Sequence, residues 1–260
     1  MRVPKFETIG VFVAETFQEQ YYWDHHQKRT DRRPPLERAL DYLSNTIGFN
    51  FITYTTPDYR NVPLVARYFS NISLDVANGQ SRALPETLPD FPGVPATFYY
   101  HVDEPELGPM DMSMLDRFVT RQRVSGKNVI VNFCGLRRHR RDIEYAKEYL
   151  TRFELPLVSV DLYPCYYDGT DWEFTLKYLS DIRPYVKGKF MAIVQAFAKP
   201  GVWRYPTVDE MVRLAWECKD RGVDCLQFFV WNSGWSGTEL LCGLDVLPRE
   251  YHRTIAAMRG

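Results

Sequence analysis

Acidic side chains stand where several short apolar stretches of the sequence end. One such stretch ends at Glu15, another at Asp103 and Glu104, and a third at Asp161. A carboxyl group is costly to bury in apolar surroundings unless it has a partner or a chemical task. Two carboxyl groups in different surroundings could therefore divide the work of a proton donor and a proton acceptor.

Glu104 is the candidate for the proton donor. It lies in the segment 99–106, which reads Tyr-Tyr-His-Val-Asp-Glu-Pro-Glu, where neighbouring tyrosines and an apolar strand would raise the pKa of the carboxyl by desolvation. Asp161, in the Asp-Leu-Tyr-Pro segment 161–164, is the candidate for the partner base. We expect Asp103 to orient the acid or to bind substrate.

Aromatic and amide side chains follow the other apolar stretches. Aromatic rings stack on the C–H faces of pyranose sugars, and amide groups bind the hydroxyls, so this set of residues predicts a carbohydrate ligand. The alternative is that the rings only pack the loops. The candidate substrate-binding residues are Glu15, Asp103, Tyr163, Gln195, Trp231, Asn232, Trp235 and Tyr100.

The elements that must position these residues alternate between strand and helix along the chain. Periodicity of the apolar residues predicts strands over 9–16, 49–55, 73–77, 96–102, 127–133, 157–162, 189–196 and 223–231. It predicts helices over 35–46, 61–71, 110–125, 141–153, 171–186, 207–221 and 248–258. Residues 79–95 are rich in proline, so the third strand is expected to lack its helix.

Strict alternation of this kind demands parallel strands joined by helical crossovers, which is the α/β class. Eight such units in 260 residues predict a (β/α)8 TIM barrel, a single domain over 1–260 with an irregular third βα unit. Active sites of this fold lie at the C-terminal ends of the strands. The acids described above would therefore meet on one face.

The Asp-Glu-Pro segment at the fourth predicted strand resembles the (β/α)8-barrel glycoside hydrolase superfamily, as do the later segments 160–164, 193–197 and 228–232. The resemblance implies that Glu104 is the general acid/base of a glycosidase. It also places a nucleophilic glutamate at the end of strand seven in retaining enzymes, where this sequence has Gln195.

Several explanations of that departure remain open. Asp161 could act as the base of an inverting mechanism, with Glu15 as the other candidate. The N-acetyl group of a substrate could serve as nucleophile instead. Catalysis could also be lost, leaving a carbohydrate-binding barrel, or the protein could be a sugar-acid lyase or isomerase.

Charge and composition exclude other classes. With 32 basic and 33 acidic residues the net charge is −1, which argues against a protein built to bind nucleic acid or an anionic membrane. Apolar runs such as 129–133 are far shorter than the roughly 20 residues of a membrane span. The basic run 137–141 would bind an anionic sugar or lie solvated in a loop.

The cysteines and histidines predict neither a disulfide framework nor a metal site. The five cysteines are widely spaced, without a Cys-x-x-Cys pair, and the adjacent histidines 25 and 26 have no third ligand at a recognisable spacing. We expect no cofactor and a cytoplasmic protein, because no signal peptide is visible. The sequence does not indicate an oligomeric state.

Overall fold

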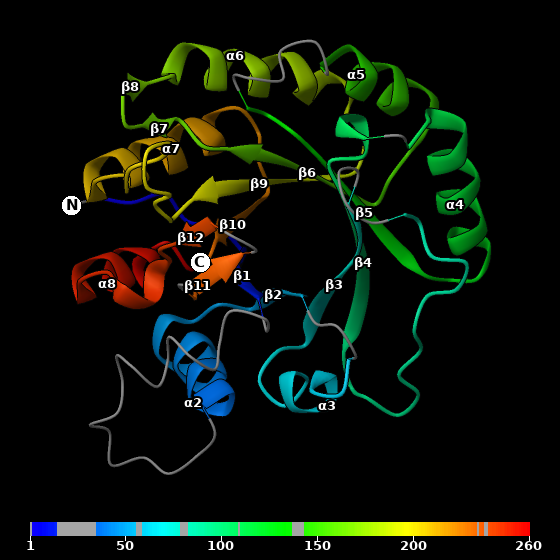
Figure 1. Ribbon diagram of the computed structural model, residues 1–260, viewed down its shortest axis with the longest axis horizontal. Coiled ribbons are helices and arrows are strands. Elements are labelled where there is room, and N and C mark those ends of the chain that lie inside the picture. The colour runs from blue at the N-terminus through cyan, green and yellow to red at the C-terminus, as the bar shows by residue number, and fades with distance from the viewer. Residues whose placement is uncertain are drawn as a thin grey trace.

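The computed structural model describes residues 2–14, 35–55, 59–78, 83–108, 110–136, 143–232, 234–236 and 239–260. Parallel strands close into a barrel, seen end-on in Figure 1, which confirms the predicted (β/α)8 fold. Around the barrel the strands follow the order β1, β10, β9, β6, β5, β4, β3, β2. Their bounds are β1 Thr8–Ala14, β2 Phe51–Thr55, β3 Asn71–Asn78, β4 Thr97–Asp103, β5 Asn128–Phe133, β6 Leu157–Leu162, β9 Lys189–Gln195 and β10 Cys225–Phe229.

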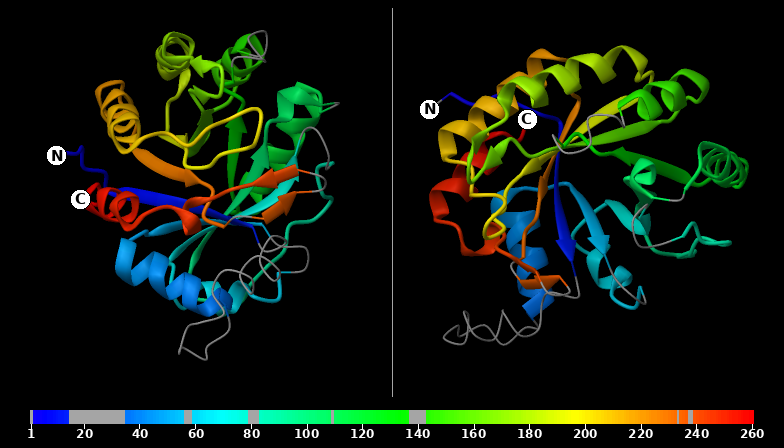
Figure 2. Two further views of the ribbon diagram at one scale, coloured as in Figure 1. Left: turned by 60° about the vertical axis from the view of Figure 1, so that its left-hand side comes forward. Right: turned by 45° about the horizontal axis from the view of Figure 1, so that its top comes forward.

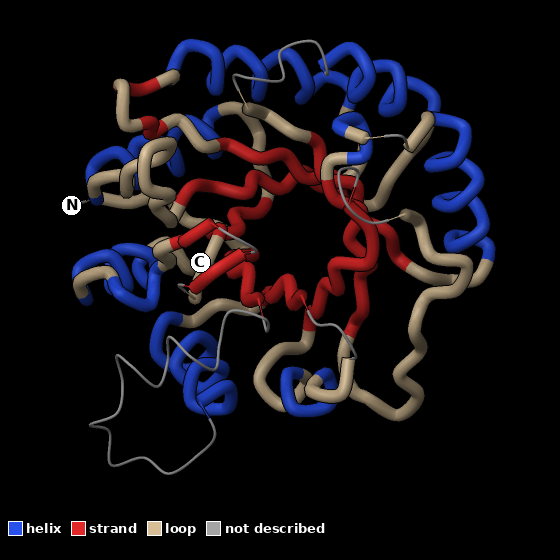
Figure 3. Tube along the Cα trace, in the orientation of Figure 1, coloured by secondary structure: helices blue, strands red, loops and turns tan. Residues whose placement is uncertain are grey.

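Helices surround the ring of strands, as Figure 3 shows, and Figure 2 gives the same layering from two other directions. Each turns an apolar stripe inward; in α5, for example, Ala146, Tyr149 and Leu150 are buried at helical spacing. The α-helices of the described residues are α2 Pro35–Asp41, α3 Val62–Val65, α4 Met112–Val124, α5 Ile143–Arg152, α6 Trp172–Ile182, α7 Val208–Asp220 and α8 Arg249–Ala257. None is long and apolar enough to cross a membrane.

The third βα unit is irregular, as the sequence predicts. Between β3 and β4 the described residues 83–96 form turns and extended chain instead of a helix. Side chains of the neighbouring strands hold this proline-rich segment: the Tyr100 hydroxyl donates to Pro89 O at 2.7 Å, and Lys127 Nζ donates to Leu88 O at 3.0 Å. The outer face of β4 is covered by this segment in place of a helix.

Other elements differ from the sequence prediction. The helix expected over 61–71 is only α3, because the hydrogen bonds after Ala66 tighten to the i−3 pattern and Asn71 already begins β3. The first helix continues from α2 into a π-helix, Tyr42–Ile47. Two short hairpins, β7–β8 (Cys165–Tyr166 with Gly169–Thr170) and β11–β12 (Gly234–Ser236 with Glu239–Leu241), are too short to give a periodic signal.

A reciprocal pair of hydrogen bonds caps the start of α7. Thr207 Oγ1 accepts a hydrogen bond from the Glu210 N–H at 3.2 Å, and Glu210 Oε2 accepts one from the Thr207 N–H at 2.8 Å. The same Glu210 carboxylate binds Arg204 through both of its oxygens. This reciprocal capping box fixes where the chain leaves the loop after β9 and enters the helix.

The end of the barrel opposite the strand C-termini is closed by apolar side chains. Alternate residues of a strand face the same side, and the inward-facing residues at this end form one buried cluster. Its members are Phe51, Ile130, Leu157, Met191 and Cys225, with Tyr99 packed against them. Any ligand of the barrel interior must therefore enter from the opposite end.

His252 of α8 gives the fold a predicted sensitivity to acid. Its Nε2 lies 2.8 Å from Leu244 O and its Nδ1 lies 3.0 Å from the Tyr42 hydroxyl, a pattern that the neutral ring satisfies. Burial is the main cause of a lowered pKa in the folded protein. The unfolded chain then binds the proton more readily, so this contribution to stability is complete above about pH 6.5 and is lost as the pH falls below it.

We expect the His252 ring to lower the free energy of unfolding, measured by urea denaturation, as the pH falls from 7.5 to 5.5. In His252→Gln, which has no titrating ring, the fall should be smaller. Equal falls in the two proteins would contradict the assignment.

Candidate functional site

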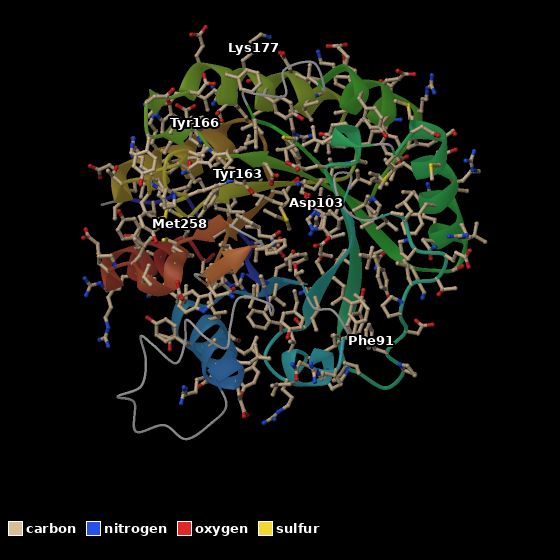
Figure 4. The ribbon with its side chains drawn as sticks, viewed as in Figure 1. Phe91, Asp103, Tyr163, Tyr166, Lys177 and Met258 are labelled. Carbon is tan, nitrogen blue, oxygen red and sulfur yellow. The ribbon has the colours of Figure 1, made fainter. Side chains whose placement is uncertain are left out.

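Three carboxyl groups gather at the C-terminal ends of β4 and β6. Asp103 ends β4, Glu104 follows it directly, and Asp161 lies in β6. The side-chain amide of Asn132, on the intervening strand β5, donates to Asp103 Oδ1 at 2.8 Å. His101 Nε2 lies 3.9 Å from the same oxygen. In Figure 4, Asp103 and Tyr163 lie toward the middle of the ring, and Lys177 lies at its periphery.

The backbone of Glu104 is held in an uncommon conformation. Its φ of 43° and ψ of 53° are left-handed, which costs energy for a residue with a side chain. Two hydrogen bonds fix the turn: the Glu104 N–H donates to Asn132 O at 2.9 Å, and Glu104 O accepts from the Leu107 N–H at 3.1 Å. Strain of this kind is typical of functional sites. Here the backbone conformation fixes the direction in which the Glu104 side chain leaves the main chain, and the residue is 8% exposed.

Asp161 is the most deeply buried acid of the three. Burial raises the pKa of its carboxyl well above the usual range, and the charges of Glu104 and Asp103 raise it further. Hydrogen bonds from Tyr163 and Asn132 act in the opposite direction but are outweighed. The Tyr163 hydroxyl donates to Asp161 Oδ1 at 3.1 Å. The charges of Glu104 and Asp103 thus act directly on the Asp161 carboxyl, and the three groups share one electrostatic neighbourhood.

A glycine lets the next connection pass close to Asp161. A Cβ atom at Gly135, just beyond β5, would lie 2.2 Å from the Asp161 carbonyl oxygen and 3.2 Å from the ring of Tyr178. No larger residue fits between β6 and this part of the chain without moving the backbone. The backbone that carries Asp161 is thus tightly confined.

Two further buried groups adjoin the acids. Glu106 Oε1 accepts a hydrogen bond from the Cys134 N–H at 2.5 Å, and burial, aided by the charges of Glu104 and Asp103, raises the pKa of Glu106 well above its usual range. Burial also raises the pKa of the Cys134 thiol, as do the nearby carboxylates of Glu104 and Asp161. A thiol in these surroundings stays protonated and is a poor nucleophile.

Aromatic rings form a wall beside the acids. Tyr163 stacks on Phe229 with ring centroids 5.9 Å apart, and Phe229 lies edge-on to Phe12 at 4.9 Å and to Phe197 at 5.4 Å. Trp203 completes the wall at 5.5 Å from Phe197. Phe12, Phe229 and Trp203 are only partly buried, so they offer apolar ring surface next to the carboxyl groups.

The structure brings together four of the residues expected from the sequence, namely Asp103, Glu104, Asp161 and Tyr163. Two others lie elsewhere. The Tyr100 ring is buried on the outer face of β4 and donates to Pro89 O. The Trp231 ring is 4% exposed and packs between the π-helix and α8, 5.9 Å from Tyr42 and 5.5 Å from His252. Neither ring is placed to stack on a ligand at the acids.

Gln195 and Asn232 are occupied by the backbone of their own neighbourhood. Gln195 Oε1 accepts from the Cys165 N–H at 2.9 Å, while Nε2 donates to the carbonyl oxygens of Cys165, Phe197 and Arg204. Asn232 pairs in both directions with the backbone of Ala14, with Nδ2 donating at 2.6 Å and Oδ1 accepting at 3.0 Å. These amides tie loops to strands.

The remaining expectations fall outside what the structure describes. Glu15 and the basic run 137–141 lie beyond the described residues. For Trp235 the structure gives the backbone alone, paired with Leu240 in the β11–β12 hairpin. In the described part of the chain, no three His, Cys, Asp or Glu side chains are arranged to hold a metal ion.

Sequence reasoning missed five residues of the site: His101, Glu106, Asn132, Phe12 and Phe229. The twofold alternation of strands carried the necessary signal for some of them. His101 lies two residues before Asp103, so it faces the same side of β4. Asn132 could be found only from the pairing of β4 with β5, which sets it beside Asp103.

No protein-family model and no curated protein sequence matches this chain. Solved structures do match. The GH53 catalytic domain of Ignisphaera aggregans has 10% identity and a TM-score of 0.62, with all of each chain covered. The β-galactosidase of the Antarctic haloarchaeon Halorubrum lacusprofundi has 12% identity and a TM-score of 0.58 over 96% of this chain.

A β-glucuronidase of Bacteroides uniformis has 14% identity and a TM-score of 0.54 over 99% of this chain. The protein has the fold of glycoside-hydrolase (β/α)8 barrels. It spans 57% of the β-galactosidase and 35% of the β-glucuronidase. At identities of 10–14% this likeness establishes the fold, and the chemistry must be argued from the residues themselves.

The setting of Gln195 predicts the outcome of restoring the acid of retaining enzymes. In Gln195→Glu a carboxylate would face three carbonyl oxygens to which it cannot donate, so we expect the free energy of unfolding to fall by about 2–3 kcal/mol. We expect no gain of glycosidase activity. Thermal denaturation with a substrate panel checks both points, and a variant of unchanged stability and raised activity would contradict this view of Gln195.

Proposed function

We propose that the protein is a glycoside hydrolase. The glycosidic bond that it cleaves would lie between the carboxyl groups of Glu104 and Asp161. The observation that carries the proposal is the set of buried carboxyl groups at the ends of β4 and β6, beside a wall of partly exposed aromatic rings. Hydrolysis of a glycosidic bond needs two carboxyl groups on opposite sides of that bond and an apolar surface for the sugar ring.

Glu104 donates the proton in this scheme. Its backbone is fixed by Asn132 and Leu107, which limits where the carboxyl can reach. As the bond between the anomeric carbon and the leaving oxygen breaks, the proton of Glu104 passes to that oxygen. Asp103, held by Asn132, remains beside the acid to bind a sugar hydroxyl or to orient Glu104.

Asp161 is the second carboxyl group. One strand, β5, separates its strand from β4, and positions two strands apart favour the wider carboxyl separation of an inverting pair, about 6.5–9.5 Å, over the closer spacing of a retaining pair. Asp161 takes a proton from a water molecule whose oxygen attacks the anomeric carbon. Gln195, whose amide is bonded to backbone, leaves the end of β9 without a nucleophile.

The substrate is proposed to be a carbohydrate whose ring lies against Phe229 and Tyr163. Phe229 replaces Trp231 in this role, because its ring lies partly exposed against Tyr163 and that of Trp231 does not. The Tyr163 hydroxyl is already engaged with Asp161, so a sugar would meet its ring face.

Removing either carboxylate tests the pair. We expect Glu104→Gln and Asp161→Asn each to lower kcat/KM by about 10²–10⁴-fold without changing the unfolding midpoint by more than a few degrees. Activity is measured on a panel of aryl glycosides and oligosaccharides. Glu148→Gln, on the exposed side of α5, is the matched control for loss of one carboxylate and should keep full activity.

Product analysis separates the proposal from its rivals. Hydrolysis in ¹⁸O-labelled water should place one label at the anomeric carbon, with inverted configuration in the first product seen by NMR. Retained configuration would favour assistance by a substrate N-acetyl group and would remove Asp161 from the role of base. Binding of sugar without turnover in the parent would favour a non-catalytic barrel, and product formed without uptake of water would favour a lyase or isomerase.

The raised pKa of Asp161 predicts the pH dependence. A base must be ionised, so kcat/KM should rise as the pH increases through the pKa of Asp161, which lies well above its usual range near 3.9. The acidic limb of the profile should therefore lie far above pH 4. An acidic limb at pH 4 or below would show that Asp161 is not the base.

A further inference from the structure

One level of the barrel core is made of polar side chains. Following the strand register around the tilted barrel, inward-facing residues fall into levels of four, contributed by alternate strands. Branched apolar residues dominate such levels in barrels of this fold. Here one level is formed by Thr53, His101, Ser159 and Gln227, and each is at most 2% exposed.

Several polar atoms at and beside this level have no protein partner. Among the described residues, no hydrogen-bond partner lies near Ser159 Oγ or Gln227 Nε2. The same is true of Ser73 Oγ, one level toward the apolar end, and of Asn132 Oδ1, one level toward the acids. Leaving a buried donor or acceptor unpaired is destabilising, so four such groups at adjoining levels point to a bound ligand.

Room for a ligand comes from small side chains. Ser73 and Ser159 occupy inward-facing positions where a branched residue would fill the core. Toward the N-terminal ends of the strands the space is closed by the apolar cluster that contains Phe51 and Met191. On the other side, beyond the level of Asn132, lie Asp103 and Asp161.

We propose that this polar level binds a cluster of ordered water molecules, which hydrogen-bonds the carboxyl groups of Asp103 and Asp161 from inside the barrel. The proposal does not depend on the glycosidase activity. Water fits because the unpartnered groups include a donor, Gln227 Nε2, an acceptor, Asn132 Oδ1, and hydroxyls that serve as either.

Charged ligands fit less well. A cation would face the N–H₂ donors of the Gln227 amide, and an anion would lie next to Asp75, Asp103 and Asp161. A buried water makes about three hydrogen bonds, so the four unpartnered groups call for on the order of two water molecules. Water at this place partly solvates carboxyl groups that the protein otherwise buries.

A crystal structure of the unmodified chain at about 1.5 Å resolution is the first test. We expect ordered water bonded to Ser159 Oγ and Gln227 Nε2, in a chain that reaches Asp161. A dry interior, in which these side chains turn to bond one another, would overturn the proposal. So would a metal ion or an organic molecule at this level.

A solution measurement uses three variants. Ser159→Val with Gln227→Leu removes the hydroxyl and the amide, Ser159→Thr keeps the hydroxyl, and Met191→Leu alters a neighbouring apolar position. Water-¹⁷O relaxation dispersion reports long-lived internal water. We expect the double variant to lose on the order of two such molecules and the other two to match the parent.

An amplitude that is unchanged in the folded double variant would overturn the proposal. Near-ultraviolet circular dichroism checks that its core is intact. If the double variant does not fold, the structure of the unmodified chain decides the question alone.

Discussion

Asn132 of β5 positions both Asp103 and Glu104 at the end of β4. Its side-chain amide donates to Asp103, and its backbone carbonyl accepts the N–H of Glu104 in the left-handed turn. Both acids are therefore positioned by a single residue on the neighbouring strand, whose pairing with β4 is part of the barrel ladder. The site depends on barrel closure, since a shift of register between β4 and β5 would separate Asn132 from both acids.

Collecting carboxyl groups in one buried place is costly, and the structure shows how the cost is limited. Like charges and burial both raise the pKa values of Asp161 and Glu106, so each carboxyl group keeps its proton to a higher pH than a solvent-exposed one. Hydrogen bonds from Tyr163 and from the Cys134 backbone satisfy one oxygen on each. Groups that differ in surroundings can then differ in protonation, which acid–base chemistry requires.

The fold and the central acids could be predicted because they follow from local patterns. Alternation of strand and helix specifies a barrel, and a barrel brings its strand ends together, so the sequence predicts that Glu104 and Asp161 lie at the same end of it. Tyr100 was assigned wrongly to this face, although strand alternation predicts otherwise: it stands three positions before Asp103, an odd offset, so the two side chains point to opposite faces of β4. Trp231 lies beyond the end of β10, where no periodicity applies.

Gln195 and Asn232 mark the limit of that reasoning. Gln195 ends its strand on the inward face, and its amide is hydrogen-bonded to the backbone of Cys165 and Arg204. Asn232 follows the last barrel strand, and its amide is hydrogen-bonded to the backbone of Ala14. Those partners come from distant turns, and no sequence spacing reveals them.

The polar level of the barrel core concerns the surroundings of the carboxyl groups. Hydroxyl and amide groups under the acids lower the packing quality of a barrel interior that apolar side chains would stabilise better. A core arranged for stability alone would place branched residues at Ser73, Ser159 and Gln227. Polar residues at these positions keep the surroundings of Asp103 and Asp161 hydrated from within, and hydration sets how far the desolvation that raises the pKa of Asp161 can go. The acid–base properties of Asp103 and Asp161 are thus determined partly by side chains that lie deeper in the barrel.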